Sequence, residues 1–415
     1  MDLNFLSRLR LMGAALMLVA GVPGAELMAR SFDPTRLQRL DAAIEGAIAE
    51  DRLAGAVMYL AQDGATAHFK AYGMSDREAR KPMQPDAIMR IASMSKAVTT
   101  VAALMLYEEG HFLLRDPIAN HLPAFKNPVV AVAGKDGAAY TTEPAKQPIR
   151  VIDLMRHTAG LTYGDGPAKE LYAKARLTGW YLAGHDETIA QVVDRLATLP
   201  LHGQPGEQYQ YGYSTDVLGR FVEAVAGEPL DQFLERRVFR PLGMKDTSFF
   251  LAPEKAARLA PVYGYEEGRL VLKEPTATTQ YLHGPRKCFS GGAGLLSTTA
   301  DYGRFLQMLL NEGELDGERL LAPATVELMR ADHHVPGFGG DTKHFGLGFW
   351  ILADPGEFGE IGSVGSYGWG SAYYPQYLVD PKERLVALFM TQLMPTGGLP
   401  LNQRFKVLTY QALVD

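Results

Sequence analysis

The residues with the clearest chemical potential are a serine and a lysine three positions apart, Ser93 and Lys96. Ser93 is the only one of the chain's 12 serines that is followed three positions later by lysine. If the segment is helical, these residues share a face, and the Lys96 amine can reach the Ser93 hydroxyl. Such a lysine can take the hydroxyl proton and make the serine nucleophilic. At the start of a helix, the Ser93 backbone N–H would also stabilise a developing oxyanion.

A second segment places Tyr211 just before a predicted helix over 215–226. A tyrosine that faces the serine and lysine can share a proton with Lys96. It can then donate that proton to a leaving group or activate an incoming water. A packing role for Tyr211 is the alternative, because the chain has 19 tyrosines.

A third segment, 363–373, is rich in glycine and precedes a predicted strand. Glycine lets the backbone approach a ligand closely. The Ala372 N–H is expected to supply a second oxyanion donor beside that of Ser93. A glycine-rich turn without a substrate role is the alternative.

Other chemistries lack their motifs in this sequence. No serine lies in Gly-x-Ser-x-Gly, and there is neither a Walker loop nor a Rossmann fingerprint, so we expect no nucleotide or other cofactor. His333, His334 and His344 lack both a His-Glu-x-x-His pattern and a cysteine partner, which favours a loop cluster over a metal site. The net charge of −6 without a basic run argues against nucleic-acid binding.

The elements that must position these residues predict an α/β fold of the α+β type. Strand-like runs lie near both ends of the chain, at 56–61, 66–72, 346–352, 372–379 and 385–390. Helical patterns lie at 34–50, 93–109, 151–156, 187–198, 215–226, 229–236, 300–311, 323–330 and 400–413, with irregular connectors at 127–148 and 159–185. We expect one antiparallel sheet built from both termini and flanked by helices, with a large, mostly helical insertion.

This pattern predicts two domains, with the active site in the cleft between them. Residues 31–85 and 335–415 would form the sheet domain, and 86–334 the helical domain. Residues 1–30 read as a secretory signal peptide, because Arg8 and Arg10 precede a short apolar run. That run is too short for a stable membrane span. An N-terminal helix is the alternative, and export is slightly favoured over the cytoplasm.

The order of these segments resembles the serine β-lactamase and penicillin-binding-protein-like superfamily. Along the chain come Ser93-x-x-Lys96, Tyr211-Gly212-Tyr213 and Trp369-Gly370-Ser371, in the places of that superfamily's Ser-x-x-Lys, Tyr-x-Asn and Lys-Thr-Gly motifs. Supporting stretches lie at 154–161, 241–244 and 291–298. The resemblance covers about residues 35 to 412 and is greatest to the family VIII carboxylesterases.

Two departures from the family pattern bear on the substrate. Tyr213 stands where penicillin-recognising members carry an asparagine that bonds the substrate's amide. Trp369 and Ser371 replace the outer residues of Lys-Thr-Gly, which removes a cation that would attract a carboxylate. We therefore expect uncharged esters, bound by Tyr213, Trp369, Gly370 and Ser371, with Trp369 as an apolar wall.

Together, these features predict a serine carboxylesterase that cleaves small to medium esters through an acyl-enzyme on Ser93. Lys96 and Tyr211 would act as a coupled acid–base pair, and which of them is the base stays open. The alternatives are a β-lactamase or D-alanyl-D-alanine peptidase, an acyltransferase, and a non-catalytic binding module. The expected partner is a small-molecule ester, and the oligomeric state is unknown.

Overall fold

The computed structural model describes residues 31–134, 139–339 and 343–414, so the predicted signal peptide over 1–30 lies outside the described residues. Within these ranges, no helix has the length and apolar character needed to cross a membrane.

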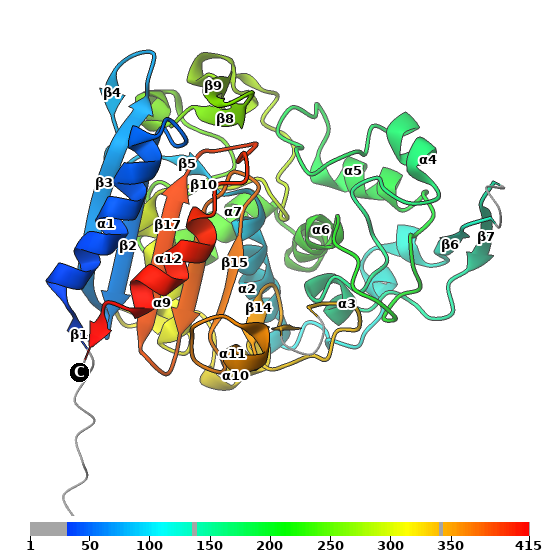
Figure 1. The fold of residues 1–415 in the computed structure, drawn as a ribbon. Helices are drawn as coiled ribbons and strands as arrows, with labels where there is room; N and C mark the ends of the chain where they lie inside the picture. The colour runs from blue at the N-terminus through cyan, green and yellow to red at the C-terminus, as the bar shows by residue number, and fades with distance from the viewer. Residues whose placement is uncertain (1–30, 135–138, 340–342, 415) are drawn as a thin grey trace, which may run out of the picture.

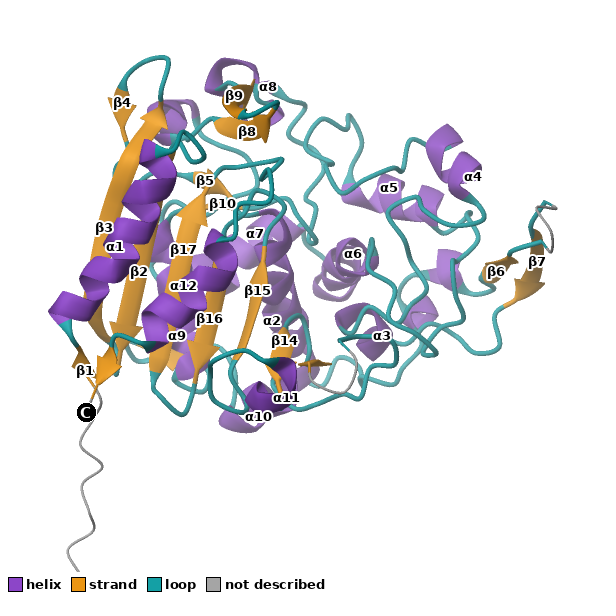
Figure 2. Ribbon diagram, in the orientation of Figure 1, coloured by secondary structure: helices purple, strands orange, loops and turns teal. Residues whose placement is uncertain are grey.

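The central sheet contains eight strands: β2 (Gly55–Gln62), β3 (Ala65–Asp76), β4 (Lys81–Pro82), β13 (Lys343–Phe345), β14 (Trp350–Leu352), β15 (Tyr367–Gly370), β16 (Gln376–Asp380) and β17 (Leu385–Thr391). They are antiparallel and lie in the order β13-β14-β15-β16-β17-β2-β3-β4 (Figure 2). Because β17 pairs with β2, the sheet joins both ends of the chain. The predicted fold class is confirmed in this respect.

Helices α1 (Pro34–Ala49), α9 (Thr299–Leu310) and α12 (Leu401–Tyr410) pack on the sheet, and α2 (Ser95–Glu108) shares the core of α9. Alternation along β2 explains why both faces are covered, because successive side chains point to opposite sides of a strand. Ala56 and Met58 join the core formed with α1 and α12, whereas Val57 and Ala61 join the core that contains α2 and α9. Figure 1 shows α1 and α12 side by side over one face.

The remaining helices are α3 (Val151–Met155), α4 (Lys169–Lys174), α5 (Ile189–Leu196), α6 (Ser214–Ala226), α7 (Leu230–Leu234), α8 (Gln280–His283), α10 (Pro323–Met329) and α11 (Pro355–Phe358). Helices α3 to α6 form a region beside the sheet (Figure 1), and α6 packs against α2. The helical segment thus lies between the two strand-forming ends in sequence, as expected. The domain boundaries proposed from the sequence stay a prediction.

Five small antiparallel pairs complete the described structure: β1 (Ser31–Phe32) with β18 (Leu413–Val414), β5 (Met89–Arg90) with β10 (Leu296–Ser297), β6 (Val129–Val132) with β7 (Thr141–Pro144), β8 (Val262–Glu266) with β9 (Arg269–Glu274), and β11 (Glu314–Leu315) with β12 (Glu318–Arg319). The β5–β10 pair matters most for the site, because β5 leads into the segment that carries Ser93.

Several boundaries differ from the sequence prediction. The strand expected over 346–352 is interrupted, because Gly348 adopts a φ of 89° and residues 346–349 connect β13 to β14. The strand expected over 372–379 begins only at Gln376, since Tyr374, at a φ of 79°, belongs to a turn. The connectors expected to be irregular contain the β6–β7 hairpin and α4.

Candidate active site

Ser93 lies in a short 3₁₀ turn, Ala92–Met94, that leads directly into α2. The turn follows β5, and the Ile91 N–H extends the β5–β10 contact by donating to the Leu295 carbonyl at 3.1 Å. Ala92 adopts a φ of 36°, which alanine rarely adopts, and such backbone strain is concentrated at functional sites. The half-buried Ser93 side chain is therefore held on a rigid, strained corner between strand and helix.

Lys96 follows one helical turn later and is only 1% exposed. Its Nζ donates to the Gly292 carbonyl at 2.8 Å and lies 3.3 Å from Ser93 Oγ and 3.2 Å from the Tyr163 hydroxyl. A carbonyl oxygen can only accept, so one Lys96 hydrogen points to Gly292. The two hydroxyls can accept or donate, so the site fits either an ammonium or an amine that takes the Ser93 proton.

The Tyr211 hydroxyl donates to Ser93 Oγ at 2.7 Å, across a sequence separation of 118 residues. Lys96 Nζ lies 4.7 Å from the centre of the Tyr211 ring. The next residue, Gly212, lies directly against the backbone of Leu161, because a Cβ at position 212 would lie 2.4 Å from the Leu161 carbonyl oxygen. Glycine therefore lets these two backbone segments lie close together. The structure thus brings together the serine, lysine and tyrosine that the sequence singled out, and their catalytic roles stay a prediction.

The ring of His157 supports Tyr211 from behind, with the two ring centres 4.8 Å apart. His157 is 0% exposed, and neither ring nitrogen has a hydrogen-bond partner among the described residues. Burial, helped by the Lys96 charge, holds the pKa of His157 well below its ordinary value. Its backbone carbonyl accepts from the Gln210 N–H at 2.7 Å. His157 therefore supports the Tyr211 segment through its backbone and through a neutral ring.

Tyr163 is a site residue that the sequence reasoning missed. Its hydroxyl is the third contact of Lys96, and burial raises its pKa well above the ordinary value, so it is a neutral hydroxyl. Its ring also packs edge-on to that of Tyr211 at 5.7 Å. Tyr163 lies in the long connector after α3, where no motif or spacing relates it to Lys96.

Tyr213 is a buried residue that packs against Tyr163. It is 1% exposed, its hydroxyl donates to the Gly179 carbonyl, and its ring packs edge-on to Tyr163 at 4.8 Å. The side chain is thus enclosed behind Tyr163, where the Gly179 carbonyl holds its hydroxyl, and the substrate contact expected of Tyr213 stays a prediction.

Trp369 and Gly370 end β15, which lies against the 3₁₀ turn that carries Ser93. The Trp369 ring is half-buried, 6.0 Å from Tyr211 and 5.5 Å from Phe345. Phe338 stacks on Trp369 at 6.4 Å. Three rings, those of Trp369, Phe338 and the buried Phe345, thus form an apolar, aromatic wall beside Tyr211.

The turn after β15 holds the remaining predicted residues. Ser371 Oγ accepts from the Tyr373 N–H at 3.3 Å, so its hydroxyl stabilises this turn. Ala372 packs against a small apolar cluster that includes Ala92, Ala293 and Tyr373. Ala372 thus belongs to the same packing cluster as Ala92, the residue that precedes Ser93. The oxyanion role of the Ser93 and Ala372 N–H groups stays a prediction.

Two other features lie outside this site. His334 and His344 each bond to Asp332, at 2.6 and 2.8 Å, and within residues 31–134, 139–339 and 343–414 no group of three or more His, Cys, Asp or Glu could hold a metal ion.

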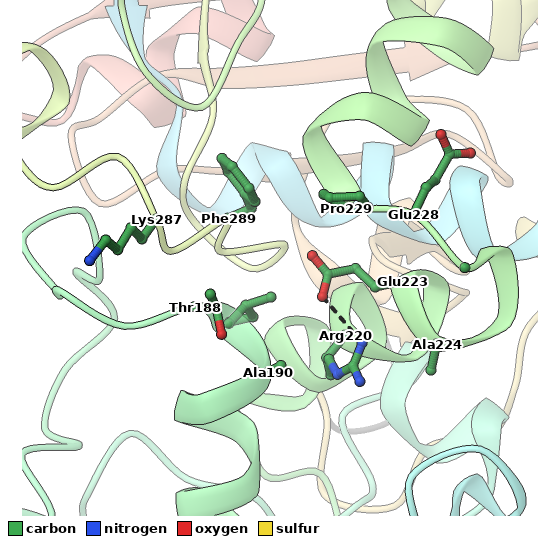
Figure 3. A pocket seen from close by; sticks show the side chains of 11 residues that line it. Thr188, Ala190, Arg220, Glu223, Ala224, Glu228, Pro229, Lys287 and Phe289 are labelled. Carbon is green, nitrogen blue, oxygen red and sulfur yellow. Dashed lines mark hydrogen bonds and ion pairs between the residues drawn. The ribbon is translucent and has the colours of Figure 1, made fainter.

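A cavity of about 490 Å³ lies between α5, α6 and the loop around Phe289 (Figure 3). Its charged groups are paired: Arg220 with Glu223, Glu228 with Arg236, and Lys287 with Asp186.

Known proteins match this chain over most of its length. The sequence profile of the Beta-lactamase family matches residues 40–411. Protein Rv1367c of Mycobacterium tuberculosis is 36% identical over 361 residues, which covers 83% of this chain and 86% of that protein. Esterase EstB of Burkholderia gladioli is 31% identical over 406 residues, covering 89% and 96%. The solved structure of EstCE1, described as a hydrolase with promiscuous acyltransferase activity, has a TM-score of 0.77 at 27% identity and covers 91% and 99%.

Proposed function

Because this chain belongs to the Beta-lactamase family, we propose that it is a carboxylesterase that cleaves small to medium carboxylic esters through an acyl-enzyme on Ser93. The observation that carries the proposal is the meeting of three groups: the Tyr211 hydroxyl lies 2.7 Å and the Lys96 amine 3.3 Å from Ser93 Oγ. A serine with two such neighbours has a route for its proton when it attacks a carbonyl.

The reaction would begin with attack of Ser93 Oγ on the ester carbonyl carbon. As the new C–O bond forms, the hydroxyl proton passes to the coupled Lys96–Tyr211 pair. The backbone N–H groups of Ser93 and Ala372 would hold the oxyanion. Tyr211 would then donate a proton to the departing alkoxide, which leaves the acyl group on Ser93. Water, activated by the same pair, would release the acid and return the proton to Ser93.

The preference for uncharged esters is argued from the residues around Tyr211. Trp369 and Phe338, backed by the buried Phe345, supply an apolar, aromatic surface where many penicillin-recognising relatives carry the lysine of Lys-Thr-Gly. A carboxylate placed against this surface would lose hydration without gaining a cationic partner. An ester with an apolar alcohol or acyl part would gain from burial there.

Acyl transfer to an alcohol is a second candidate, since EstCE1 is described as a hydrolase with promiscuous acyltransferase activity. The same acyl-enzyme would then be cleared by an alcohol instead of water. The two activities differ only in which hydroxyl reaches the acyl group. Product analysis in the presence of added alcohol separates them.

The experiment that tests the proposal compares hydrolysis of p-nitrophenyl butyrate, ethyl butyrate and the β-lactam nitrocefin by wild type and Ser93→Ala. We expect efficient ester cleavage by wild type, little nitrocefin cleavage, and loss of ester cleavage in Ser93→Ala. Ser95→Ala is the matched control, because Ser95 is buried and its hydroxyl accepts from the Leu295 N–H. Efficient nitrocefin turnover with poor ester turnover would contradict the proposed substrate class. Full esterase activity of Ser93→Ala would contradict the mechanism.

A further inference from the structure

Asp216 is a buried carboxyl group close to the candidate site that the mechanism above does not use. It is the third residue of α6, 1% exposed, and lies five positions after Tyr211. Its Oδ1 accepts from Ser290 Oγ at 2.5 Å and from the Gly292 N–H at 3.2 Å. Its Oδ2 is buried and has no hydrogen-bond partner among the residues described.

The hydrogen bonds of Asp216 end on the turn that orients Lys96. That turn, residues 290–294, presents the Gly292 carbonyl to Lys96 Nζ at 2.8 Å. On its other side, Thr99 Oγ1 donates to the Gly291 carbonyl at 2.7 Å, which ties the turn to α2. A Cβ at Gly292 would lie 2.5 Å from Asp216 Oδ2, so the carboxyl and the turn are in direct contact. Asp216 therefore holds the turn from the side of α6.

The charges around Asp216 also point to Lys96. Burial raises the pKa of the Asp216 carboxyl, while the Ser290 hydrogen bond and the Lys96 charge act in the opposite direction. The other ionisable groups that feel its charge are Tyr163, Tyr213 and Cys288, and burial raises the pKa of each of them, so they stay neutral. Among these groups, Lys96 is the one that can balance an Asp216 carboxylate.

We propose that Asp216 is a positioning residue for Lys96: it fixes the turn whose carbonyl orients the lysine, and its carboxylate balances the ammonium that forms when Lys96 takes the Ser93 proton. This inference rests on the proposed function, because it gives Lys96 a role as proton acceptor. In the step concerned, the Ser93 O–H bond breaks, an N–H bond forms on Lys96, and Ser93 Oγ bonds to the electrophile. Asp216 exchanges no proton and acts through its charge.

The test uses a fluorophosphonate probe, which phosphonylates an activated serine without depending on the natural ester. Ser93 Oγ bonds to phosphorus, fluoride leaves, and the serine proton passes to Lys96. The rate of labelling is measured against pH for wild type, Asp216→Asn and Ser290→Ala. Asparagine keeps an oxygen that accepts from Gly292 and Ser290 but removes the charge. Ser290→Ala removes one hydrogen bond to Asp216, and one from the Ala293 N–H, but keeps the carboxyl group.

In wild type, we expect the labelling rate to reach a plateau at high pH and to fall at low pH, which is the acid limb of the pH profile. Asp216→Asn should lower the plateau rate by about tenfold and move the acid limb about one pH unit lower. The sign follows from the charge: removing a nearby anion makes the positively charged, inactive form of the site less favourable, so labelling continues to lower pH. Ser290→Ala should leave the acid limb where it is in wild type. Asp216→Ser is a second uncharged variant with room for a water molecule, and it should show the same shift.

A wild-type acid limb in a folded Asp216→Asn or Asp216→Ser protein would overturn the inference. An equal shift in Ser290→Ala would overturn it as well, because a lost contact would then suffice. Failure of both uncharged variants to fold would assign Asp216 a structural role instead. Absence of labelling at Ser93 in wild type would overturn the proposed function and this inference together, whereas normal labelling with an unshifted limb would overturn this inference alone.

Discussion

Replacing Tyr211 by phenylalanine removes one oxygen atom from the candidate site and leaves the aromatic ring in place. The ring packs against His157, Tyr163 and Trp369, at centre-to-centre distances of 4.8, 5.7 and 6.0 Å, and none of these contacts involves the hydroxyl. The lost hydrogen bond to Ser93 is worth about 1 kcal/mol of stability. General acid–base assistance is worth roughly 10²–10⁴-fold in rate. Tyr211→Phe should therefore fold nearly as well as wild type and lose at least about 100-fold in kcat.

Two esters of butyric acid show which step the hydroxyl serves. p-Nitrophenolate leaves readily without a proton, whereas ethoxide needs one. If Tyr211 is the acid for the leaving group, the variant should lose more activity on ethyl butyrate than on p-nitrophenyl butyrate. Tyr209→Phe is the matched control, because the Tyr209 ring lies 6.3 Å from that of Tyr211 in the same group of aromatic residues. Near-wild-type activity of Tyr211→Phe, or an equal loss in Tyr209→Phe, would refute this reasoning.

Three further predictions concern groups that surround the site. The pKa of His157 lies well below 6.5 in the folded protein. Only the unfolded chain therefore gains its proton near that pH, and stability falls as pH drops below 6.5, by up to about 1.4 kcal/mol per unit. In His157→Leu, the free energy of unfolding measured in urea should depend less on pH than in wild type. The same pH dependence in both proteins would contradict the lowered pKa of His157. Arg90 is 0% exposed and pairs at 3.0 Å with Glu274, which is 25% exposed, so Glu274→Gln should cost about 2 kcal/mol, again measured by urea unfolding; a neutral effect would contradict this. Gly212→Ala places a Cβ 2.4 Å from a backbone oxygen and should lower both kcat and the melting temperature, unlike Gly46→Ala, whose Cβ has no atom within 4 Å; equal behaviour of the two would refute the packing argument.

The sequence was most informative where chemistry depends on local spacing. Ser93 and Lys96 are one helical turn apart, so their proximity follows from a helix alone. The strands at 56–61 and 66–72 could be predicted because two strand-like runs and the Asp63-Gly64 turn that joins them are also local features of the sequence. Tyr211 needed the family resemblance, since nothing local relates it to a serine 118 residues away.

The features that could not be predicted from the sequence depend on tertiary packing or on local backbone conformation. Tyr163 reaches Lys96 from a long connector, and Asp216 looks in sequence like an ordinary acidic residue in the first turn of a helix. Tyr213 is next to the site in sequence, but its hydroxyl is held by Gly179 in the helical region. Strand boundaries near Gly348 and Tyr374 depend on backbone conformations that apolar runs do not reveal.

The central claim is that Ser93 forms the acyl-enzyme, and the most direct measurement is the mass of the protein quenched during turnover of p-nitrophenyl butyrate. The account predicts a species heavier by one butyryl group, mapped to the peptide that contains Ser93 and absent from Ser93→Ala. The adduct should decay in wild type and persist in Tyr211→Phe, because deacylation needs the same proton relay. A butyryl group found on another residue, or found equally in Ser93→Ala, would contradict the account.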